Sequence, residues 1–367
     1  MKKRKTSSIG RLIFFTLFFK MKLLIFSGLR DKKLISKISP IISLEKIEKV
    51  YLIRNSPLQY QKLKSLSPPF YIIFISESIK FLCGLYVCLF KKIDYIIGIF
   101  LRPHGIFAYI FGKIFKKPVI QLFVGNDVDF IKKHERLFKN LLKSSARIGV
   151  RGSRSKKKLY DIVKKENKFF IHHNVYSPPA VNQEISGEKK MQDIVCIADF
   201  TKVKRIDVFL KVISKIKQKY PGIKASMAGG NGRKHHYEKM KHRMNLDENV
   251  TFEGIVNDVY SYLMKGRLFM MTSEAEGLPM SLIESMSVGL PCIVPDVGDI
   301  PDIAEDGTNA LVVTPLDVEG FASSAIRLLE DENLYEKISQ NAINTIRKKE
   351  KEFSLEYNKE IWDNILG

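Results

Sequence analysis

The sequence predicts an α/β protein with two domains, each built on a doubly wound parallel sheet. Three observations lead to this prediction. The chain has 367 residues, which exceeds one ordinary domain and suits two domains of middle size. Short apolar runs, typical of buried strands, alternate with helical stretches of about 10 to 15 residues. A stretch rich in proline, serine and charge at residues 177–190 divides two such series and indicates a linker.

The first series covers the N-terminal half of the chain. Residues 70–90 are apolar and aromatic over a longer length, interrupted by Ser76, Glu77 and Lys80. This segment is interpreted as a buried helix, or as a strand that runs into one; the alternative is that part of it contacts a membrane or a lipid tail. Buried strands are expected at residues 21–26, 49–53, 93–99, 118–124, 147–151 and 169–172.

The second series follows the linker and ends in a helical tail. Strands are expected at residues 193–197, 224–228, 250–252, 268–272 and 291–295, and helices at 205–219, 237–244 and 279–288. The tail, residues 318–366, is expected to be helical in three segments. The predicted domains are residues 21–180 and 186–345, with residues 346–367 as a helix that returns to the N-terminal domain.

Residues 1–20 form a basic and apolar leader. Four basic residues at positions 2–5 precede an apolar run at 12–19 that is too short to span a bilayer. No small-residue cleavage site follows, although a signal peptide would need one. The leader is either a basic segment that touches a membrane or the product of an upstream start codon, and the folded part is expected to begin at Met21.

The chain is strongly basic, with a formal net charge of +22. A field of this sign suits a polyanionic partner, such as nucleic acid, an anionic membrane surface or a phosphorylated substrate. A genomic bias towards lysine is the alternative. The four cysteines lie in apolar contexts without a CxxC pair, and they are predicted to be reduced core thiols of a cytoplasmic protein.

The most informative stretch runs from Thr272 to Pro295. A strand is expected to end at Thr272, a short loop carries Glu276, and Pro279 suits the first position of a helix. A loop at the carboxyl end of a strand and before a helix N-terminus is a usual phosphate site in α/β sheets. Because carboxylates repel phosphate, Glu276 and Glu284 are expected to face the hydroxyl groups of a sugar or ribose. The alternative is an ordinary strand–turn–helix with solvated glutamates.

This stretch resembles the signature of the retaining glycosyltransferases of family 4 (group 1), whose two Rossmann-like domains face each other across a cleft in the GT-B architecture. The signature has two glutamates separated by seven residues, here Glu276 and Glu284, with a glycine after the first and Met-x-x-Gly-x-Pro after the second, here residues 286–291. The resemblance implies that Glu276 holds hydroxyls of the donor sugar and Glu284 the ribose hydroxyls. It also implies donor contacts for the residues after Glu276: Gly277, Leu278, Pro279, Met280 and Ser281.

A lysine of the family's diphosphate site also has its counterpart. Lys204 matches the lysine that the family places on the donor diphosphate. Asp199, however, stands where the family normally has an arginine. Because two cations neutralise a diphosphate better than one, Lys202 or Arg205 is expected to compensate.

Other segments follow the order of the family. Gly229 and Gly230 lie in a turn similar to the family's glycine-rich turn, and Val256 lies in the segment whose backbone meets the nucleotide base. The resemblance is weaker in the N-terminal half. There His104 is the candidate for a histidine that reaches the donor sugar, with a structural histidine as the alternative, and Gly28 is the candidate for a glycine near the diphosphate.

Two groups of residues have the residue types of a metal site. Asp127 and Asp129 form an Asp-x-Asp, the metal motif of the other large glycosyltransferase fold, but three-residue matches often arise by chance. His235, His236 and His242 share a helical region without a carboxylate or cysteine to complete a ligand set. Both groups are interpreted as lacking a metal.

The resemblance implies a hexosyltransferase that moves a sugar from a nucleotide diphosphate sugar to an acceptor with retention of configuration, without a cofactor or metal. The basic charge, the lysine-flanked apolar stretch at 99–120 and the leader favour a lipid-linked or envelope glycan acceptor at the inner face of the cell membrane, with no nucleic acid partner. The alternatives are a GT-B-like nucleotide-sugar epimerase, a protein that binds nucleic acid or another polyanion, and a family member without catalytic activity.

Overall fold

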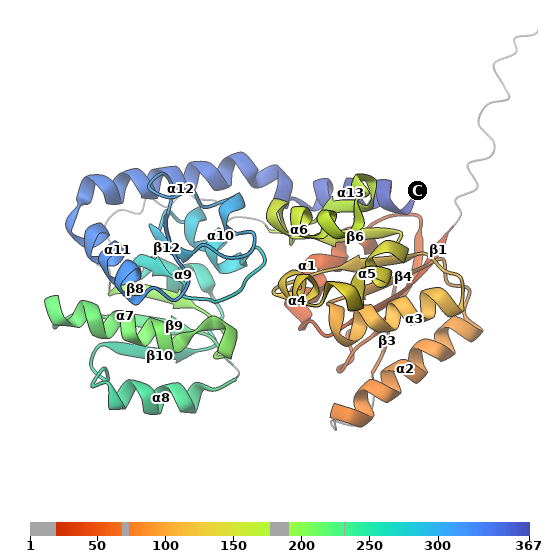
Figure 1. Cartoon of the computed structure of the whole chain (residues 1–367), viewed down its shortest axis with the longest axis horizontal. Helices are drawn as coiled ribbons and strands as arrows, with labels where there is room; N and C mark the ends of the chain where they lie inside the picture. Colours follow the sequence, from red (N-terminus) through yellow and green to blue (C-terminus); the bar gives the residue numbers. More distant parts are fainter. Residues whose placement is uncertain (1–19, 68–72, 177–190, 231) are drawn as a thin grey trace, which may run out of the picture.

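The structure is a computed structural model that describes residues 20–67, 73–176, 191–230 and 232–367. The chain forms one seven-stranded sheet, of order β3-β2-β1-β4-β5-β6-β7, and one six-stranded sheet, of order β10-β9-β8-β11-β12-β13. Figure 1 shows the two sheets, with their helices, as two domains that lie side by side. The predicted fold class, two parallel-sheet α/β domains, is confirmed. The expectations for the leader at 1–19 and the linker at 177–190 fall outside the described residues.

The N-terminal domain is organised around strands that are apolar on both faces. Leu23, Leu24, Ile25 and Phe26 of β1 are all fully buried, as expected for a central strand of a parallel sheet covered by helices. The strands are β1 (Met21–Ser27), β2 (Ile47–Ile53), β3 (Leu63–Leu66), β4 (Tyr95–Ile99), β5 (Val119–Leu122), β6 (Arg147–Val150) and β7 (Phe169–Ile171). The helices are α1 (Asp31–Ile42), α2 (Ile73–Phe90), α3 (Ile106–Ile114), α4 (Asp127–Lys133), α5 (Glu135–Ser144) and α6 (Ser153–Val163), with short turns η1 (Leu101–Gly105) and η2 (Glu166–Lys168).

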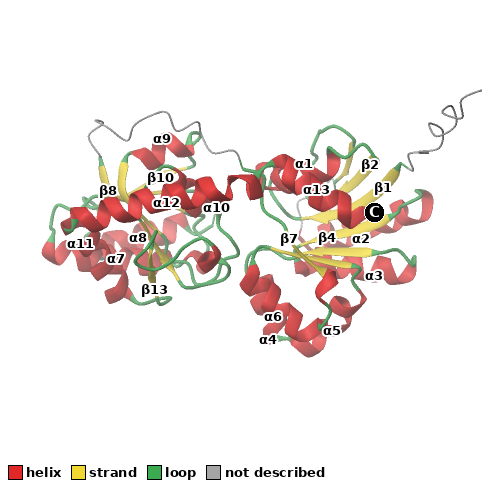
Figure 2. Ribbon diagram, turned by 90° about the horizontal axis from the view of Figure 1, so that it is seen from above, coloured by secondary structure: helices red, strands yellow, loops and turns green. Residues whose placement is uncertain are grey.

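Helices cover both faces of this sheet (Figure 2). Helix α1 packs on one face with Leu23 and Ile25 of β1, whereas α2 and α3 pack on the other face with Leu24 and Phe26. Residues 73–90 therefore form a helix against the sheet, although the helix is only partly buried.

The C-terminal domain repeats this plan. Its strands are β8 (Gln192–Ile197), β9 (Ala225–Ala228), β10 (Val250–Gly254), β11 (Gly266–Met270), β12 (Cys292–Pro295) and β13 (Leu311–Val313). Its helices are α7 (Ile206–Lys219), α8 (Lys234–Arg243), α9 (Val259–Met264), α10 (Met280–Ser287) and α11 (Val318–Glu330), with turns η3 (Lys202–Lys204) and η4 (Ile300–Asp302). All four cysteines are free thiols; Cys196 and Cys292 are buried, as predicted for core thiols, whereas Cys83 and Cys88 of α2 are only partly buried.

The end of the chain connects the two domains. After α11, helix α12 (Glu332–Phe353) packs on α10 and leads into α13 (Leu355–Leu366), which packs on α1. Trp362 and Leu366 are buried in the apolar cluster of the N-terminal domain. The tail thus has three helices, and the expected boundary at residues 345 and 346 lies inside one continuous helix.

Candidate donor site between the domains

The candidate residues lie at the carboxyl ends of strands in both sheets. The loop after β1 and the loop after β8 approach each other, since Arg30 Nη1 lies 3.7 Å from Asp199 Oδ1. The loop after β11 approaches the end of β6, because a Cβ atom added at Gly277 would lie 3.1 Å from Arg151 Cγ. In open α/β sheets ligands bind outside these strand ends. The arrangement therefore places the candidate site between the two domains.

The loop between β11 and α10 forms the floor of the site. The strand ends at Met270, two residues earlier than expected, and Pro279 is the N-cap of α10 in extended conformation (φ −74°, ψ 131°), so it is not the first helical residue as predicted. Glu276, Gly277, Leu278 and Pro279 are buried, whereas Met280 and Ser281 are partly exposed. The first N–H groups of a helix have no intrahelical acceptor, so the start of α10 offers donors to an anion.

Lys204 and Glu276, predicted to serve different parts of the donor, form an ion pair. Lys204 Nζ lies 2.5 Å from Glu276 Oε1, and the two side chains are 24% and 9% exposed. Two further contacts hold the η3 turn on this loop: the Thr272 hydroxyl donates to the carbonyl of Arg205 (3.1 Å), and the N–H of Glu274 donates to the carbonyl of Val203 (2.8 Å). A cation and a carboxylate are thus presented together beside the N-terminus of α10.

The glycine-rich turn closes tightly on the neighbouring strand. A Cβ atom at Gly229 would lie 1.8 Å from the carbonyl oxygen of Ala198, and a Cβ atom at Gly230 would lie 2.5 Å from Ile255 Cγ1. Only glycine fits at these two positions without movement of neighbouring atoms. Val256, after the next strand, packs against the core cluster that contains Leu278. Strands β8, β9 and β10 are neighbours in the sheet, so the segments that follow them lie side by side.

The second glutamate of the motif lies on α10 and is partly exposed. Burial raises the pKa of Glu284, and the charge of Lys33 from the N-terminal domain acts in the opposite direction. A carboxylate in such a place is a good acceptor for hydroxyl groups, because a hydrogen bond from a ligand restores part of the solvation lost on burial.

Asp199, at the position of the family's arginine, lies opposite a cation from the other domain. Its carboxylate pairs with Arg30, which precedes α1 and is largely exposed. Arg205, expected to compensate together with or instead of Lys202, is paired with two carboxylates: Arg205 Nη2 lies 2.7 Å from Asp207 Oδ2 and Arg205 Nη1 lies 3.3 Å from Glu274 Oε2. Its expected contact with the diphosphate stays a prediction. Lys202 remains exposed at the surface. Arg30 therefore supplies the positive charge next to residue 199.

His104 and Gly28 come together in the N-terminal domain. His104 is 5% exposed, and a Cβ atom at Gly28 would lie 2.8 Å from its Cε1 atom. Burial, with a smaller contribution from Lys80, lowers the pKa of His104 to about 3, so the ring is neutral at physiological pH. Among the described residues, neither ring nitrogen has a hydrogen-bond partner. A buried neutral imidazole with two unused nitrogens can bind a ligand hydroxyl.

Carboxylates of the C-terminal domain cap a helix of the N-terminal domain. Asp302 accepts hydrogen bonds from the N–H (2.5 Å) and hydroxyl (2.6 Å) of Ser153, and Asp299 accepts them from the N–H (2.8 Å) and hydroxyl (2.6 Å) of Ser155. Both serines lie in the first turn of α6, where negative charge is favourable. The backbone N–H of Asp299 also donates a hydrogen bond to the carbonyl oxygen of Gly277 (3.1 Å), so Asp299 connects the domain interface to the motif loop.

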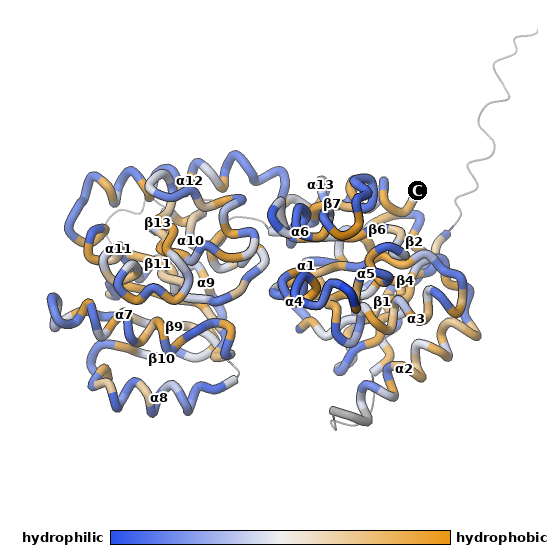
Figure 3. The backbone as a smooth tube through the Cα atoms, in the orientation of Figure 1, coloured by the Kyte–Doolittle hydropathy of each residue, from blue (hydrophilic) through white to orange (hydrophobic). Residues whose placement is uncertain are grey.

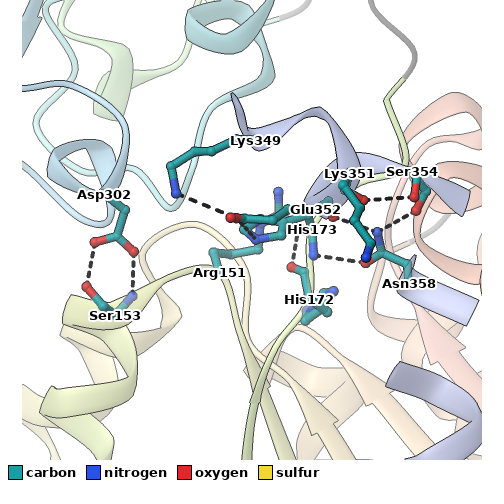
Figure 4. Close-up of polar contacts among 10 residues, drawn as sticks. All are labelled: Arg151, Ser153, His172, His173, Asp302, Lys349, Lys351, Glu352, Ser354 and Asn358. Atoms are coloured by element: carbon teal, nitrogen blue, oxygen red, sulfur yellow. Dashed lines mark hydrogen bonds and ion pairs between the residues drawn. The ribbon is translucent and has the colours of Figure 1, made fainter. Parts of the chain in front are cut away.

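A second set of contacts joins α12 to the end of the N-terminal sheet (Figure 4). His173 Nε2 lies 3.6 Å from Glu352, and Arg151 Nη1 donates to the carbonyl of His172 at 2.8 Å. Burial lowers the pKa of Arg151 to about 10 and that of His173 to about 3. The contact between His173 and Glu352 thus joins α12 to the end of the N-terminal sheet, beside the buried Arg151 and His172.

The two groups with the residue types of a metal site form hydrogen bonds and ion pairs with other protein groups. Asp127 Oδ2 accepts N–H bonds from Leu101 (3.2 Å) and Val124 (3.1 Å), whereas Asp129 pairs with Lys158 at 2.6 Å. On α8, His242 Nδ1 lies 2.7 Å from Asp247. Within the described ranges, no three histidine, cysteine or acidic residues are close enough to hold a metal ion.

Several residues at the site were not found from the sequence. Arg30 and Lys33 face Asp199 and Glu284 across the interface, and Lys80 lies near His104. The only signal for Arg30 was its place two residues after Gly28. Nothing in the sequence pattern indicated its partner, because the two residues of the pair are 169 positions apart (199 − 30).

Comparison with known proteins places the C-terminal half of the chain beside one family. Residues 180–345 match the family model described as glycosyl transferases group 1. This match covers the C-terminal domain and contains Lys204, Glu276 and Glu284.

Three curated relatives illustrate the range of similar sequences. N-acetyl-alpha-D-glucosaminyl L-malate synthase of Bacillus anthracis is 27% identical over 176 residues, which is 47% of this chain and 46% of the relative. Poly(glycerol-phosphate) alpha-glucosyltransferase of Bacillus subtilis is 27% identical over 189 residues, which is 50% of this chain and 27% of the relative. The O-antigen biosynthesis glycosyltransferase WbnH of Escherichia coli is 30% identical over 193 residues, covering 52% of each. The chain spans half or less of the length of the first of these relatives.

Solved structures match nearly the whole chain. Anabaena HepE in complex with UDP and glucose has a TM-score of 0.72 at 15% identity and covers 94% of this chain and 99% of that chain. Sucrose-phosphate synthase from Thermosynechococcus elongatus has a TM-score of 0.73 at 14% identity, and the match covers 94% of this chain and 98% of that chain. At these identities the likeness concerns the fold, which is the two-domain GT-B architecture.

Proposed function

We propose that the protein is a glycosyltransferase of family 4 that transfers a sugar from a nucleotide diphosphate sugar to an acceptor, with retention of anomeric configuration. The observation that carries this proposal is the Lys204–Glu276 pair beside the start of α10, within the stretch that matches group 1 glycosyltransferases. Lys204 and the N–H groups of α10 offer positive charge to a diphosphate, and Glu276 and Glu284 offer acceptors to hydroxyl groups.

The chemistry needs no covalent contribution from the protein. The bond from the anomeric carbon to the phosphate oxygen breaks, and a bond from that carbon to the acceptor oxygen forms on the same face. The acceptor proton passes to the departing phosphate oxygen, so a separate general base and a metal are not part of the proposal. Lys204 stabilises the negative charge that develops on the leaving diphosphate. His104 and Gly28 approach the donor from the N-terminal domain, and domain contact excludes water that would hydrolyse the donor.

The acceptor is proposed to be a lipid-linked or envelope glycan at the cytoplasmic face of an anionic membrane. Relatives named for poly(glycerol-phosphate) glucosylation and O-antigen biosynthesis support an envelope acceptor. The net charge of +22 supports an anionic surface.

The test is a thermal-shift and hydrolysis screen against UDP- and GDP-sugars without added metal, with Glu284→Ala as the matched variant. We expect stabilisation by one nucleotide family, slow release of the free sugar, and loss of both in the variant. The configuration of the first released or transferred product, measured by NMR, tests retention. Epimerisation of the donor without an acceptor would replace this proposal with an epimerase. The absence of any response in the wild-type protein would contradict donor binding and favour a member without catalytic activity.

A further inference from the structure

One face of α2 is apolar but uncovered. Leu82, Tyr86, Leu89 and Phe90 are 59%, 52%, 58% and 67% exposed, and their spacing of four, three and one residues places them along one side of the helix. The opposite side packs into the core, where Val87 is fully buried. A helix that is apolar all round is normally buried on all sides, so the exposed side needs a partner.

The end of α3 continues this apolar face. Phe81 of α2 packs on Phe111 of α3 with ring centroids 4.7 Å apart, and the charge of Lys117 acts on Cys88 near the end of α2. The two helices thus end close together (Figures 1 and 3). Ile114, at the end of α3, is 60% exposed. In the lysine-flanked stretch at 99–120, from which the sequence suggested membrane contact, buried residues alternate with partly exposed and exposed ones.

Lysines surround these apolar side chains. We define the α2/α3 surface as the five exposed apolar residues together with five lysines that flank them: Lys91, Lys92, Lys113, Lys116 and Lys117. No carboxylate pairs with these five lysines in the part of the chain that the structure describes. An apolar strip with unpaired lysines at its border is the pattern of helices that lie in the headgroup region of a bilayer.

We propose that the α2/α3 surface docks on a bilayer that contains anionic lipid. The apolar side chains would enter the boundary between headgroups and acyl chains, and the lysines near the surface would be attracted to anionic headgroups. A second copy of the chain is the less favourable occupant, because a symmetric contact would bring two sets of five lysines together. None of the described helices is long and apolar enough to span a membrane, which leaves docking on the surface as the mode of contact that this inference concerns.

The same helix connects this surface to the candidate site. Lys80, two residues before Leu82, is buried near His104, and the Ser76 hydroxyl donates to Asn55 Oδ1 (3.2 Å) in the loop after β2. From Leu82 to Phe90 the helix rises about 12 Å. Docking of α2 would hold the site near an acceptor whose lipid part stays in the membrane. This role in transfer rests on the proposed function, whereas the docking itself does not.

Vesicle flotation with the full chain tests this inference, without donor or acceptor. Vesicles of phosphatidylcholine alone are compared with vesicles that also contain phosphatidylglycerol, at low and at high salt. We expect binding to the anionic vesicles only, reduced by salt. Leu89→Ser/Phe90→Ser and Lys91→Glu/Lys92→Glu should each weaken binding about tenfold or more. Leu137→Ser and Lys139→Glu on α5, where Leu137 is 73% exposed, are matched controls and should bind like the wild type.

The outcomes separate this inference from the proposed function. Equal vesicle binding by the wild type and the α2 variants would overturn the inference, since another part of the chain would then make the contact. A wild type that ignores anionic vesicles but forms a dimer, which Leu89→Ser/Phe90→Ser dissociates in analytical ultracentrifugation, would overturn it in favour of self-association. Donor turnover in solution is measured separately, so its failure would affect only the proposed function.

Discussion

Replacement of Lys204 by methionine tests the central ion pair. Methionine keeps most of the side-chain volume and removes the charge, so Glu276, with a side chain only 9% exposed, loses the cation that lies 2.5 Å away. Removal of one partner from a fully buried pair typically costs about 3–5 kcal/mol, and because Lys204 is 24% exposed we expect about 1–3 kcal/mol. For a domain of this size that corresponds to a fall in Tm of roughly 3–8 °C.

The double variant Lys204→Met/Glu276→Gln separates charge from packing. Because no unpaired charge remains, we expect it to recover most of the lost stability in thermal and urea unfolding, while donor-induced stabilisation stays absent. The control is Lys215→Met, which breaks a 2.8 Å pair with Glu319 on the exposed surface of the same domain and should change stability by less than about 1 kcal/mol. If Lys204→Met is as stable as the wild type, or if the double variant is as unstable as the single one, the electrostatic account of this pair is refuted.

Three further predictions concern the domain interface, the glycine turn and pH. Arg30→Ala should weaken binding of a nucleotide diphosphate about tenfold in calorimetry, and Asp199→Arg added to it should restore binding; no rescue would show that the cation at this position is unimportant. Gly229→Ala places a Cβ atom 1.8 Å from a backbone oxygen and should lower stability by more than about 2 kcal/mol in urea unfolding, whereas Gly222→Ala, with open space around it, should not. His104 and His173 have folded-state pKa values lowered from 6.5 to about 3, so the unfolded chain takes up protons first as the pH falls. Each of these two histidines should therefore lower the free energy of unfolding by up to about 1.4 kcal/mol per pH unit as the pH falls below about 6.5. In unfolding measured at several pH values, His104→Gln should make this dependence less steep. A free energy of unfolding that rises on acidification would contradict the assignment.

The sequence predicted elements whose signal is local. Strands such as β1 and β8 contain continuous apolar runs, and the motif loop is recognised from glutamates, glycine and proline at fixed spacing. The sequence does not predict strand β3, because its four residues, Leu63–Leu66, comprise one exposed lysine and three partly exposed residues at the edge of the sheet. Strand β13 has only three residues. Edge strands of this kind have too little apolar pattern to differ from loops.

The sequence could not predict contacts that depend on how the domains meet. The capping of α6 by Asp299 and Asp302 and the pair between Arg30 and Asp199 join residues more than a hundred positions apart. Their partners are set by the packing of two separate sheets and by the path of α12 between them, and neither leaves a periodic signal in the chain. Resemblance to a family supplied roles for the motif residues, but it could only mark Asp199 as a departure.

The exchange of arginine for aspartate at position 199 has a consequence for how the site is assembled. With an arginine there, both cations for a diphosphate would belong to the C-terminal domain and would be in place whatever the other domain does. Here Lys204 belongs to the C-terminal domain and Arg30 to the N-terminal domain, and Arg30 reaches its place only when the domains are in contact. On the proposed function, with Lys204 and Arg30 both near the donor diphosphate, donor binding is expected to favour the arrangement in which the domains are in contact, and that arrangement is expected to tighten donor binding by the same factor.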